Sequence, residues 1–322
     1  MTQTANSGID IVMPAYNCAL WLDQTIDSIL SQDFTAWRLI ARDDASRDST
    51  HSRLMAWQNR LGERMIVLPD SGAANLGVTG NYNAVLAVTA APWVMSADPD
   101  DIWLPGKISR TGEAMAWAEA RFGAATPIAI CTDAAVVDGA GRPVAPSYWR
   151  WSRMSLAGAS EPRATAMESV ALGSTMMMNR PLLNLALPIP AAAPYQDWWL
   201  AICAAAFGRV LPLPEQTILY RRHSANETAN PYTSVGARAL GRAVTAPGAA
   251  QQRLRKIVSQ SSAIAGAFVE RFGGRLAARD RAALESLARL SALGPIERRI
   301  ALMRHGLWFS SRLKNLGLLL LV

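Results

Sequence analysis

Cysteine is scarce in this chain, and the few cysteines present are not paired in sequence. The 322 residues include only Cys18, Cys131 and Cys203, with no Cys-x-x-Cys spacing. An odd number of cysteines without that spacing argues against a disulfide framework and against a structural zinc site. The composition therefore predicts a reducing compartment, the cytosol.

Long apolar runs are also missing. No stretch approaches the roughly 18 apolar residues that a membrane-spanning helix needs. Residues 1–8 are polar and contain no apolar segment typical of a signal peptide. Residues 316–322 are apolar, but they are too few to cross a bilayer. We therefore expect no spanning segment and no secretion signal.

Acidic residues are few in the last part of the chain. From Arg238 onward there are 15 Lys and Arg against 4 Asp and Glu, whereas the preceding part has 17 against 21. Residues 230–247 are rich in small residues, Gly and Pro, which is typical of a linker. The pattern predicts two parts with different roles: a domain over residues 1–229 and a basic helical extension over residues 230–322.

The first part alternates between strand-like and helix-like patterns. Apolar runs of strand length are separated by stretches with helical spacing, which predicts βαβ units and a mainly parallel sheet flanked by helices. Sheets of this class bind ligands at the carboxyl ends of their strands. The predicted strands cover residues 9–13, 37–41, 65–68, 93–97, 128–132, 175–178 and 209–220, and the predicted helices cover residues 19–31, 48–61, 77–90, 105–120, 197–207, 251–272, 276–293 and 295–316.

Three carboxylates follow one of these strands within four residues, in the run Asp98-Pro99-Asp100-Asp101. Carboxylates this close repel one another unless a cation lies among them. Oxygen ligands of this kind suit Mg²⁺ or Mn²⁺, which bridges the phosphates of a nucleotide. The alternative is an acidic turn that caps the following helix.

Two further segments lie at predicted strand ends. Tyr16 follows Pro14 and offers an aromatic face for a nucleobase, although packing at a strand end explains a tyrosine there equally well. Asp43 and Asp44 provide acceptors for a pyrimidine N–H or a ribose hydroxyl, whereas helix capping is the alternative and is our interpretation of Asp48.

These segments, in this order and spacing, resemble the family 2 glycosyltransferases with the GT-A fold. Within that family the chain is similar to the bacterial rhamnosyltransferase-like branch over about residues 9–226. The combination is more specific than any single motif. The similarity rests on Asn75-Leu76-Gly77-Val78-Thr79-Gly80-Asn81-Tyr82, Ser96-Ala97-Asp98-Pro99-Asp100-Asp101-Ile102-Trp103-Leu104-Pro105-Gly106-Lys107, Gly173-Ser174-Thr175-Met176-Met177-Met178-Asn179-Arg180, Leu187-Pro188-Ile189-Pro190, Gln196-Asp197-Trp198-Trp199-Leu200 and Tyr220-Arg221-Arg222-His223.

The resemblance implies roles on the donor side. Asp100 matches the metal ligand of the family's Asp-x-Asp motif, Asp98 lies nearer the ribose, and the role of Asp101 stays open. Tyr16 and Asp44 match the nucleobase pocket, with Asp43 as the second choice. The same resemblance places Pro14 and Asn81 in the nucleotide-binding site.

On the acceptor side, Asp197 matches the acid that serves as general base. A carboxylate before Trp198 and Trp199 is also an ordinary helix cap, but partial desolvation by the two indoles would raise its pKa and suit proton abstraction. His223 falls where some GT-A enzymes have another metal ligand. The branch usually shows His-Asp, and Gln196 here replaces that histidine, which puts the acceptor side and the pH profile in question.

The resemblance implies an inverting, metal-dependent transfer of a sugar from a nucleoside diphosphate to an acceptor hydroxyl. The donor expected is a dTDP- or UDP-sugar, with dTDP-L-rhamnose suggested by the branch, and the pathway expected is the synthesis of a cell-surface polysaccharide (O-antigen, capsule or exopolysaccharide). A nucleotidyltransferase is the nearest rival, but residues 14–18 lack its glycine-rich basic loop. A non-catalytic sugar-binding GT-A protein is the second rival.

The extension combines basic and apolar residues. Such a helix can lie on an anionic membrane, which would bring a lipid-linked acceptor to the cytoplasmic face of the bacterial inner membrane. Packing on the catalytic domain or a homodimer contact is the alternative, and we expect no nucleic-acid partner because no known motif occurs there. The residues in question are Arg298, Arg299, Arg304, Arg312 and Lys314, interleaved with Ile300, Leu302, Leu307, Trp308, Phe309 and Leu313.

Overall fold

The computed structural model describes residues 8–69, 75–223 and 247–321. The predicted linker and the predicted boundary at residue 229 lie outside these ranges. Each strand predicted from the sequence is present, with ends that differ by a few residues, and β5 and β7 were not predicted. The strands are β1 (Ile9–Ala15), β2 (Trp37–Asp43), β3 (Met65–Val67), β4 (Trp93–Ser96), β5 (Ile102–Trp103), β6 (Ile128–Asp138), β7 (Pro143–Ala145), β8 (Met176–Asn179) and β9 (Arg209–Arg222).

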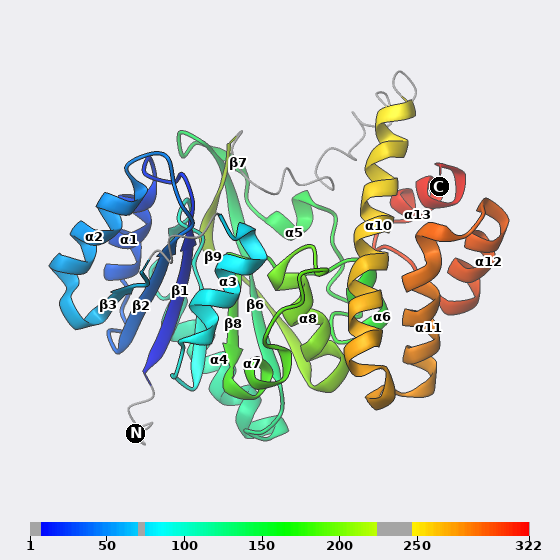
Figure 1. Ribbon diagram of the computed structural model, residues 1–322, viewed down its shortest axis with the longest axis horizontal. Coiled ribbons are helices and arrows are strands. Elements are labelled where there is room, and N and C mark those ends of the chain that lie inside the picture. Colours follow the sequence, from blue (N-terminus) through cyan, green and yellow to red (C-terminus); the bar gives the residue numbers. More distant parts are fainter. Residues whose placement is uncertain (1–7, 70–74, 224–246, 322) are drawn as a thin grey trace.

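Helices lie on both sides of the strands (Figure 1). In the first part they are α1 (Leu22–Leu30), α2 (Thr50–Leu61), α3 (Gly77–Ala87), α4 (Lys107–Phe122), α5 (Tyr148–Trp151), α6 (Pro162–Met167), α7 (Arg180–Ala186) and α8 (Gln196–Phe207). The extension contributes α10 (Pro247–Phe272), α11 (Ala278–Arg289), α12 (Pro295–His305) and α13 (Arg312–Leu321).

Within the described ranges the nine strands form one mixed sheet, in the order β3-β2-β1-β4-β8-β6-β9-β5 with β7 beside β6. The pairs β1–β2, β2–β3 and β1–β4 are parallel, whereas β8 runs antiparallel to both β4 and β6. The predicted mainly parallel mixed sheet with flanking helices is confirmed. Because β1, β2 and β4 are parallel neighbours, the loops that follow them meet at one edge.

The central strand β1 is buried on both faces, as expected for a parallel strand covered by helices. Its one charged residue, Asp10, is 2% exposed, and both oxygens of its carboxylate have partners. One carboxylate oxygen accepts the backbone N–H groups of Ala90 and Ala91, and the other pairs with Arg38. This arrangement satisfies a buried charge and fixes the loop before β4.

The crossing from α8 into β9 requires a glycine. A Cβ atom at Gly208 would lie 1.8 Å from the carbonyl oxygen of Pro127, which is far inside contact distance. The same carbonyl accepts the backbone N–H of Arg209, so β9 starts directly against the beginning of β6. The close approach brings the long strands β6 and β9 into parallel register.

The helices of the extension pack beside α6 and α8 at one side of the sheet domain (Figure 1). Aromatic side chains hold α10 against α8: the Trp199 ring lies 5.7 Å from Phe268 and 6.1 Å from Phe272 between centroids. A buried ion pair between Lys314 and Glu168 joins α13 to the loop after α6. None of the described helices is long and apolar enough to cross a membrane.

The predicted helix over residues 295–316 is wrong, because α12 ends at His305 and α13 begins at Arg312. Gly306 terminates α12 with a φ of 62°, a conformation that glycine adopts without strain. The predicted amphipathic face also differs: Leu302, Leu307 and Phe309 are buried. Ile300 of the predicted face is exposed, and α12 exposes Ile296 and Met303 beside it, which were not predicted.

Candidate active site

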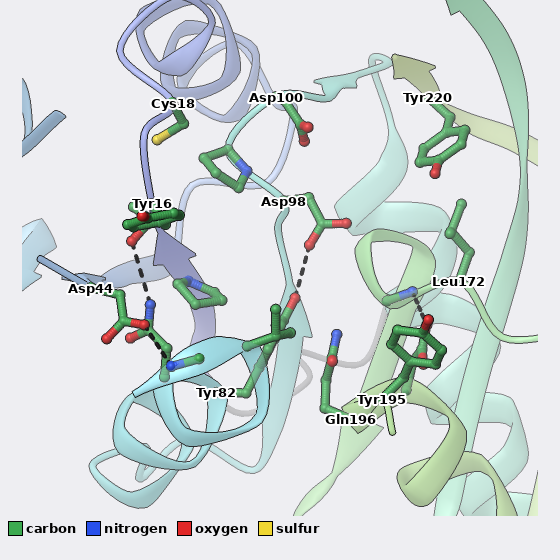
Figure 2. A pocket seen from close by; sticks show the side chains of 18 of the residues that line it. Tyr16, Cys18, Asp44, Tyr82, Asp98, Asp100, Leu172, Tyr195, Gln196 and Tyr220 are labelled. Carbon is green, nitrogen blue, oxygen red and sulfur yellow. Dashed lines mark hydrogen bonds between the residues drawn. The ribbon is translucent and has the colours of Figure 1, made fainter. Parts of the chain in front are cut away.

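A pocket of about 490 Å³ opens where β1, β2 and β4 end. Figure 2 shows Tyr16 and Asp44 at one end and Tyr195 and Tyr220 at the other, with Asp98 between them. Of the residues predicted for the site, one does not line this pocket: Asp43. The predicted residues that do line it are Pro14, Tyr16, Asp44, Asn81, Asp98, Asp100, Asp197 and His223.

Asp44 closes one end of the pocket. Its Oδ1 atom pairs with Arg42 at 2.6 Å and accepts the N–H of Leu76, and its Oδ2 atom accepts the N–H of Gly77. Both N–H groups lie at the start of α3, where a helix has unsatisfied donors. Asn81 accepts a second bond from Arg42, so a buried network fixes the ends of β2 and α3 around the pocket.

Tyr16 is the open aromatic surface at this end. Its side chain is 45% exposed and lines the pocket just after Pro14 at the end of β1. A planar base could stack on such a face. Asp43 serves its own loop instead, since its two oxygens accept the backbone N–H and the hydroxyl of Ser46.

Asp98 lies on the pocket floor after β4. Its Oδ1 atom accepts the hydroxyl of Tyr82 at 2.9 Å, a bond visible in Figure 2. Burial, and then the charge of Asp100, raise the pKa of Asp98 to about 7. A cation or a ribose hydroxyl beside Asp98 would therefore favour its charged form.

Asp100 and His223 form the pair that could hold a metal ion. Asp100 Oδ2 and His223 Nε2 are 2.9 Å apart, and the His223 ring stacks on Trp21 with centroids 3.8 Å apart. Adjacent ligands of an octahedral Mg²⁺ ion lie about 3 Å from each other, so the pair fits a shared divalent cation. The described residues contain no group of three or more His, Cys, Asp or Glu side chains that could hold a metal ion. Phosphate oxygens of the nucleotide and water would therefore complete the coordination shell of the ion.

Asp101, whose role the sequence left open, is a buried residue that stabilises the backbone of the Asp98-Pro99-Asp100-Asp101 segment. It is 0% exposed, and its oxygens accept the hydroxyl of Ser174 and the backbone N–H of Arg221. The Arg221 guanidinium in turn donates to the carbonyl of Asp100 and to the side chain of Gln24. This cluster fixes the backbone that presents Asp98 and Asp100 to the pocket.

Asp197 is the second residue of α8 and lines the pocket on the wall away from Asp44. Its Oδ1 atom accepts the N–H of Trp198 and its Oδ2 atom accepts the N–H of Gly173. Burial raises the pKa of Asp197 to about 6, although these N–H groups pull it down. A carboxylate of this kind is ionised at neutral pH and still basic enough to take a proton from a hydroxyl.

Sequence reasoning missed several residues of the site. Tyr82 and Gly173 occur in the motif segments but no role was assigned to them, and Tyr195 and Gln260 gave no signal at all. Gln260 comes from α10, and its amide donates to the hydroxyl of Tyr195 at 3.2 Å, so the extension contributes to the pocket wall. The sequence also suggests Trp149 for an acceptor groove, with buried packing as the alternative. The indole is buried, and its N–H donates to the carbonyl oxygen of Val170.

Parts of the chain are similar to known proteins. Residues 10–135, from β1 into β6, match the family described as Glycosyl transferase family 2. A Nostoc sp. protein named as an uncharacterized glycosyltransferase is 24% identical over 221 residues, which cover 68% of this chain and 66% of that protein. The Escherichia coli protein WfgD, named as a UDP-Glc:alpha-D-GlcNAc-diphosphoundecaprenol beta-1,3-glucosyltransferase, is 29% identical over 100 residues, or 31% of this chain and 38% of that one.

Solved structures show the fold. TarS 1–349 of S. aureus in complex with UDP-GlcNAc aligns with a TM-score of 0.52 at 14% identity, covering 97% of this chain and 89% of that one. The mannosyltransferase PcManGT of Pyrobaculum calidifontis, in complex with GDP-Man and Mn²⁺, aligns with a TM-score of 0.51 at 16% identity, covering 97% and 87%. The predicted GT-A fold is confirmed by this likeness.

Proposed function

We propose that this chain is an inverting glycosyltransferase that moves a sugar from a nucleoside diphosphate to an acceptor hydroxyl. One observation carries the proposal: a single pocket is lined by the aromatic face of Tyr16, by the Asp100–His223 pair, and by the buried carboxylate of Asp197. The family match over residues 10–135 supports the same reaction class.

The donor would lie across the ends of β1, β2 and β4. Its base stacks on Tyr16 near Asp44, and its ribose lies beside Asp98. We propose a pyrimidine nucleotide, UDP or dTDP, because UDP-sugars are named for both WfgD and TarS, while the resemblance to the rhamnosyltransferase-like branch favours dTDP-L-rhamnose. The sugar then points toward Asp197.

Asp100 and His223 would hold Mg²⁺ or Mn²⁺, which when bound neutralises charge on the diphosphate leaving group. PcManGT with Mn²⁺ supports this assignment. Asp197 takes the proton of the acceptor hydroxyl as that oxygen attacks the anomeric carbon. Attack on the face opposite the leaving diphosphate inverts the configuration at that carbon.

We also propose a lipid-linked saccharide as the acceptor, in the synthesis of a cell-surface polysaccharide. The named acceptor of WfgD, a diphosphoundecaprenol-linked sugar, supports this choice. Peripheral contact with the cytoplasmic face of the inner membrane would bring the two together. The face proposed for that contact is the exposed apolar stripe of α12 at Ile296, Ile300 and Met303, flanked by the exposed Arg299 and Arg304.

The test of the donor site is a calorimetric titration. We expect UDP or dTDP to bind wild-type protein in the presence of Mn²⁺ or Mg²⁺, and to bind at least tenfold more weakly to Asp100→Ala or without metal. GDP serves as the nucleotide control. Failure of all three nucleotides to bind the wild-type protein would contradict the proposed donor site.

A further inference from the structure

One buried polar atom of the pocket has no hydrogen-bond partner among the residues that the structure describes. Gln196, the first residue of α8, lines the pocket and is 7% exposed. Its side chain points into the pocket in Figure 2, between Tyr82 and Tyr195. The side-chain oxygen Oε1 is buried and has no hydrogen-bond partner among the described residues.

Neighbouring groups fix which end of the amide is used. The Tyr82 hydroxyl donates its proton to Asp98 Oδ1, so its oxygen is left to accept. The Gln196 amide nitrogen and the Tyr82 hydroxyl are both close neighbours of Gly173. Only the amide nitrogen can donate toward such an acceptor, and the amide oxygen can only accept, so the oxygen is the atom that needs a donor from elsewhere.

The backbone behind the amide leaves it little room to move. A Cβ atom at Gly173 would lie 3.0 Å from Gln196 Nε2, 3.6 Å from the Tyr82 hydroxyl and 3.7 Å from Asp197 Oδ2. Gly173 therefore packs directly against these three groups. The amide lies near the Asp197 carboxylate and near the Tyr82 hydroxyl, which donates to Asp98.

A buried carbonyl oxygen without a partner costs free energy, which a bound ligand recovers by donating a hydrogen bond. The nearby carboxylates of Asp98 and Asp197 disfavour an anionic ligand group at this point. A neutral donor, such as a sugar hydroxyl, suits it. The position between those carboxylates is also where the transferred ring must lie if the proposed function is correct.

We propose that Gln196 recognises the transferred sugar, by accepting a hydrogen bond from one of its ring hydroxyls through Oε1. The inference rests on the proposed function and adds to it a residue that distinguishes among donor sugars. It predicts that Gln196 contributes to the binding of a nucleotide sugar and not to the binding of the nucleotide alone.

The experiment compares two ligands of one nucleotide on the same variants. Calorimetry with Mn²⁺ would measure UDP against UDP-glucose, and dTDP against dTDP-L-rhamnose, on wild type, Gln196→Ala, Gln196→His and the exposed control Gln252→Ala. We expect Gln196→Ala to bind the nucleotide sugar about three- to tenfold more weakly, with the affinity for the nucleotide unchanged within twofold. Gln196→His, which keeps a donor and an acceptor, should recover part of the loss, and Gln252→Ala should match wild type.

The other outcomes are separable. An equal loss for nucleotide and nucleotide sugar, reproduced by Tyr82→Phe, would show that Gln196 acts through Tyr82 and Asp98, and would overturn the proposal. Unchanged affinity for both ligands in Gln196→Ala would also overturn it while leaving the proposed function intact. Absence of nucleotide binding to wild-type protein would instead contradict the proposed function itself.

Discussion

Asp197 illustrates how one carboxylate is tuned by its surroundings. Two backbone N–H groups stabilise its charged form, while burial on the pocket wall opposes that effect and raises its pKa to about 6. With a pKa of about 6, the carboxylate is ionised at neutral pH and is still basic enough to accept a proton. The proposed proton transfer depends on this balance.

The pH dependence of transfer follows from this pKa. A base must be deprotonated, so kcat, measured with the donor and metal at saturation, should fall about tenfold per pH unit below pH about 6 and level off above it. Asp197→Asn should lower kcat by roughly 10²–10⁴-fold with nucleotide affinity retained. Product formation between pH 5 and 8 measures both effects, and an unchanged acidic limb in Asp197→Asn would assign the titration to another group.

The sequence predicted part of the pocket lining, because Asp44, Asp98 and Asp100 stand after strands, where packing alone does not need a carboxylate. The role of Asp101 and the orphaned oxygen of Gln196 could not be predicted. Both depend on residues that are distant in the sequence, Arg221 beside Asp101 and Gly173 beside Gln196. Gln260 had no signal because it faces Tyr195 only once α10 has packed in place.

At the scale of elements, strand patterns were predicted well and helix junctions less well. Buried runs such as β1 are apolar throughout, which identifies them without tertiary information. The break between α12 and α13 depends on the left-handed conformation of Gly306, which ends α12. The apolar spacing on both sides of this glycine is still compatible with one continuous helix, so the pattern did not reveal the break. The short β5 forms only by pairing with β9, so nothing local encodes it.

The junction of α8 and β9 offers a test of the sheet. Gly208→Ala places a methyl group against the carbonyl of Pro127, and relief requires β9 to move away from β6. We expect a loss of about 3 kcal/mol in the free energy of unfolding, measured by urea denaturation. Gly274→Ala is the matched control because a Cβ atom there meets nothing within 4 Å, and equal stability of the two variants would contradict this packing.

At the scale of the whole molecule, the basic extension packs on the sheet domain and also exposes a face of its own. The ion pair of Lys314 with Glu168 and the burial of Leu302 and Phe309 support the packing alternative for much of the predicted amphipathic surface. The stripe at Ile296, Ile300 and Met303 is the part of α12 left for a membrane. Its exposed fractions are 72%, 54% and 62%.

Vesicle binding tests this face. We expect the protein to sediment with vesicles containing 30% phosphatidylglycerol, on the order of tenfold more than with pure phosphatidylcholine, and less so at high salt. Ile300→Glu should abolish most of this binding, whereas Trp117→Glu, which alters an exposed apolar residue of α4, should not. Equal sedimentation with both vesicle types, or insensitivity to Ile300→Glu, would contradict a membrane role for α12.

The aromatic contact between α8 and α10 has a practical consequence for anyone who expresses the protein in pieces. Trp199 is fully enclosed, and Phe268 and Phe272 of α10 form part of its enclosure. A recombinant fragment ending at residue 229 would present that indole and the neighbouring Phe207 to water, and it would lose Gln260 from the pocket wall. Such a fragment should therefore precipitate or require detergent, although its sequence contains every motif of the family match.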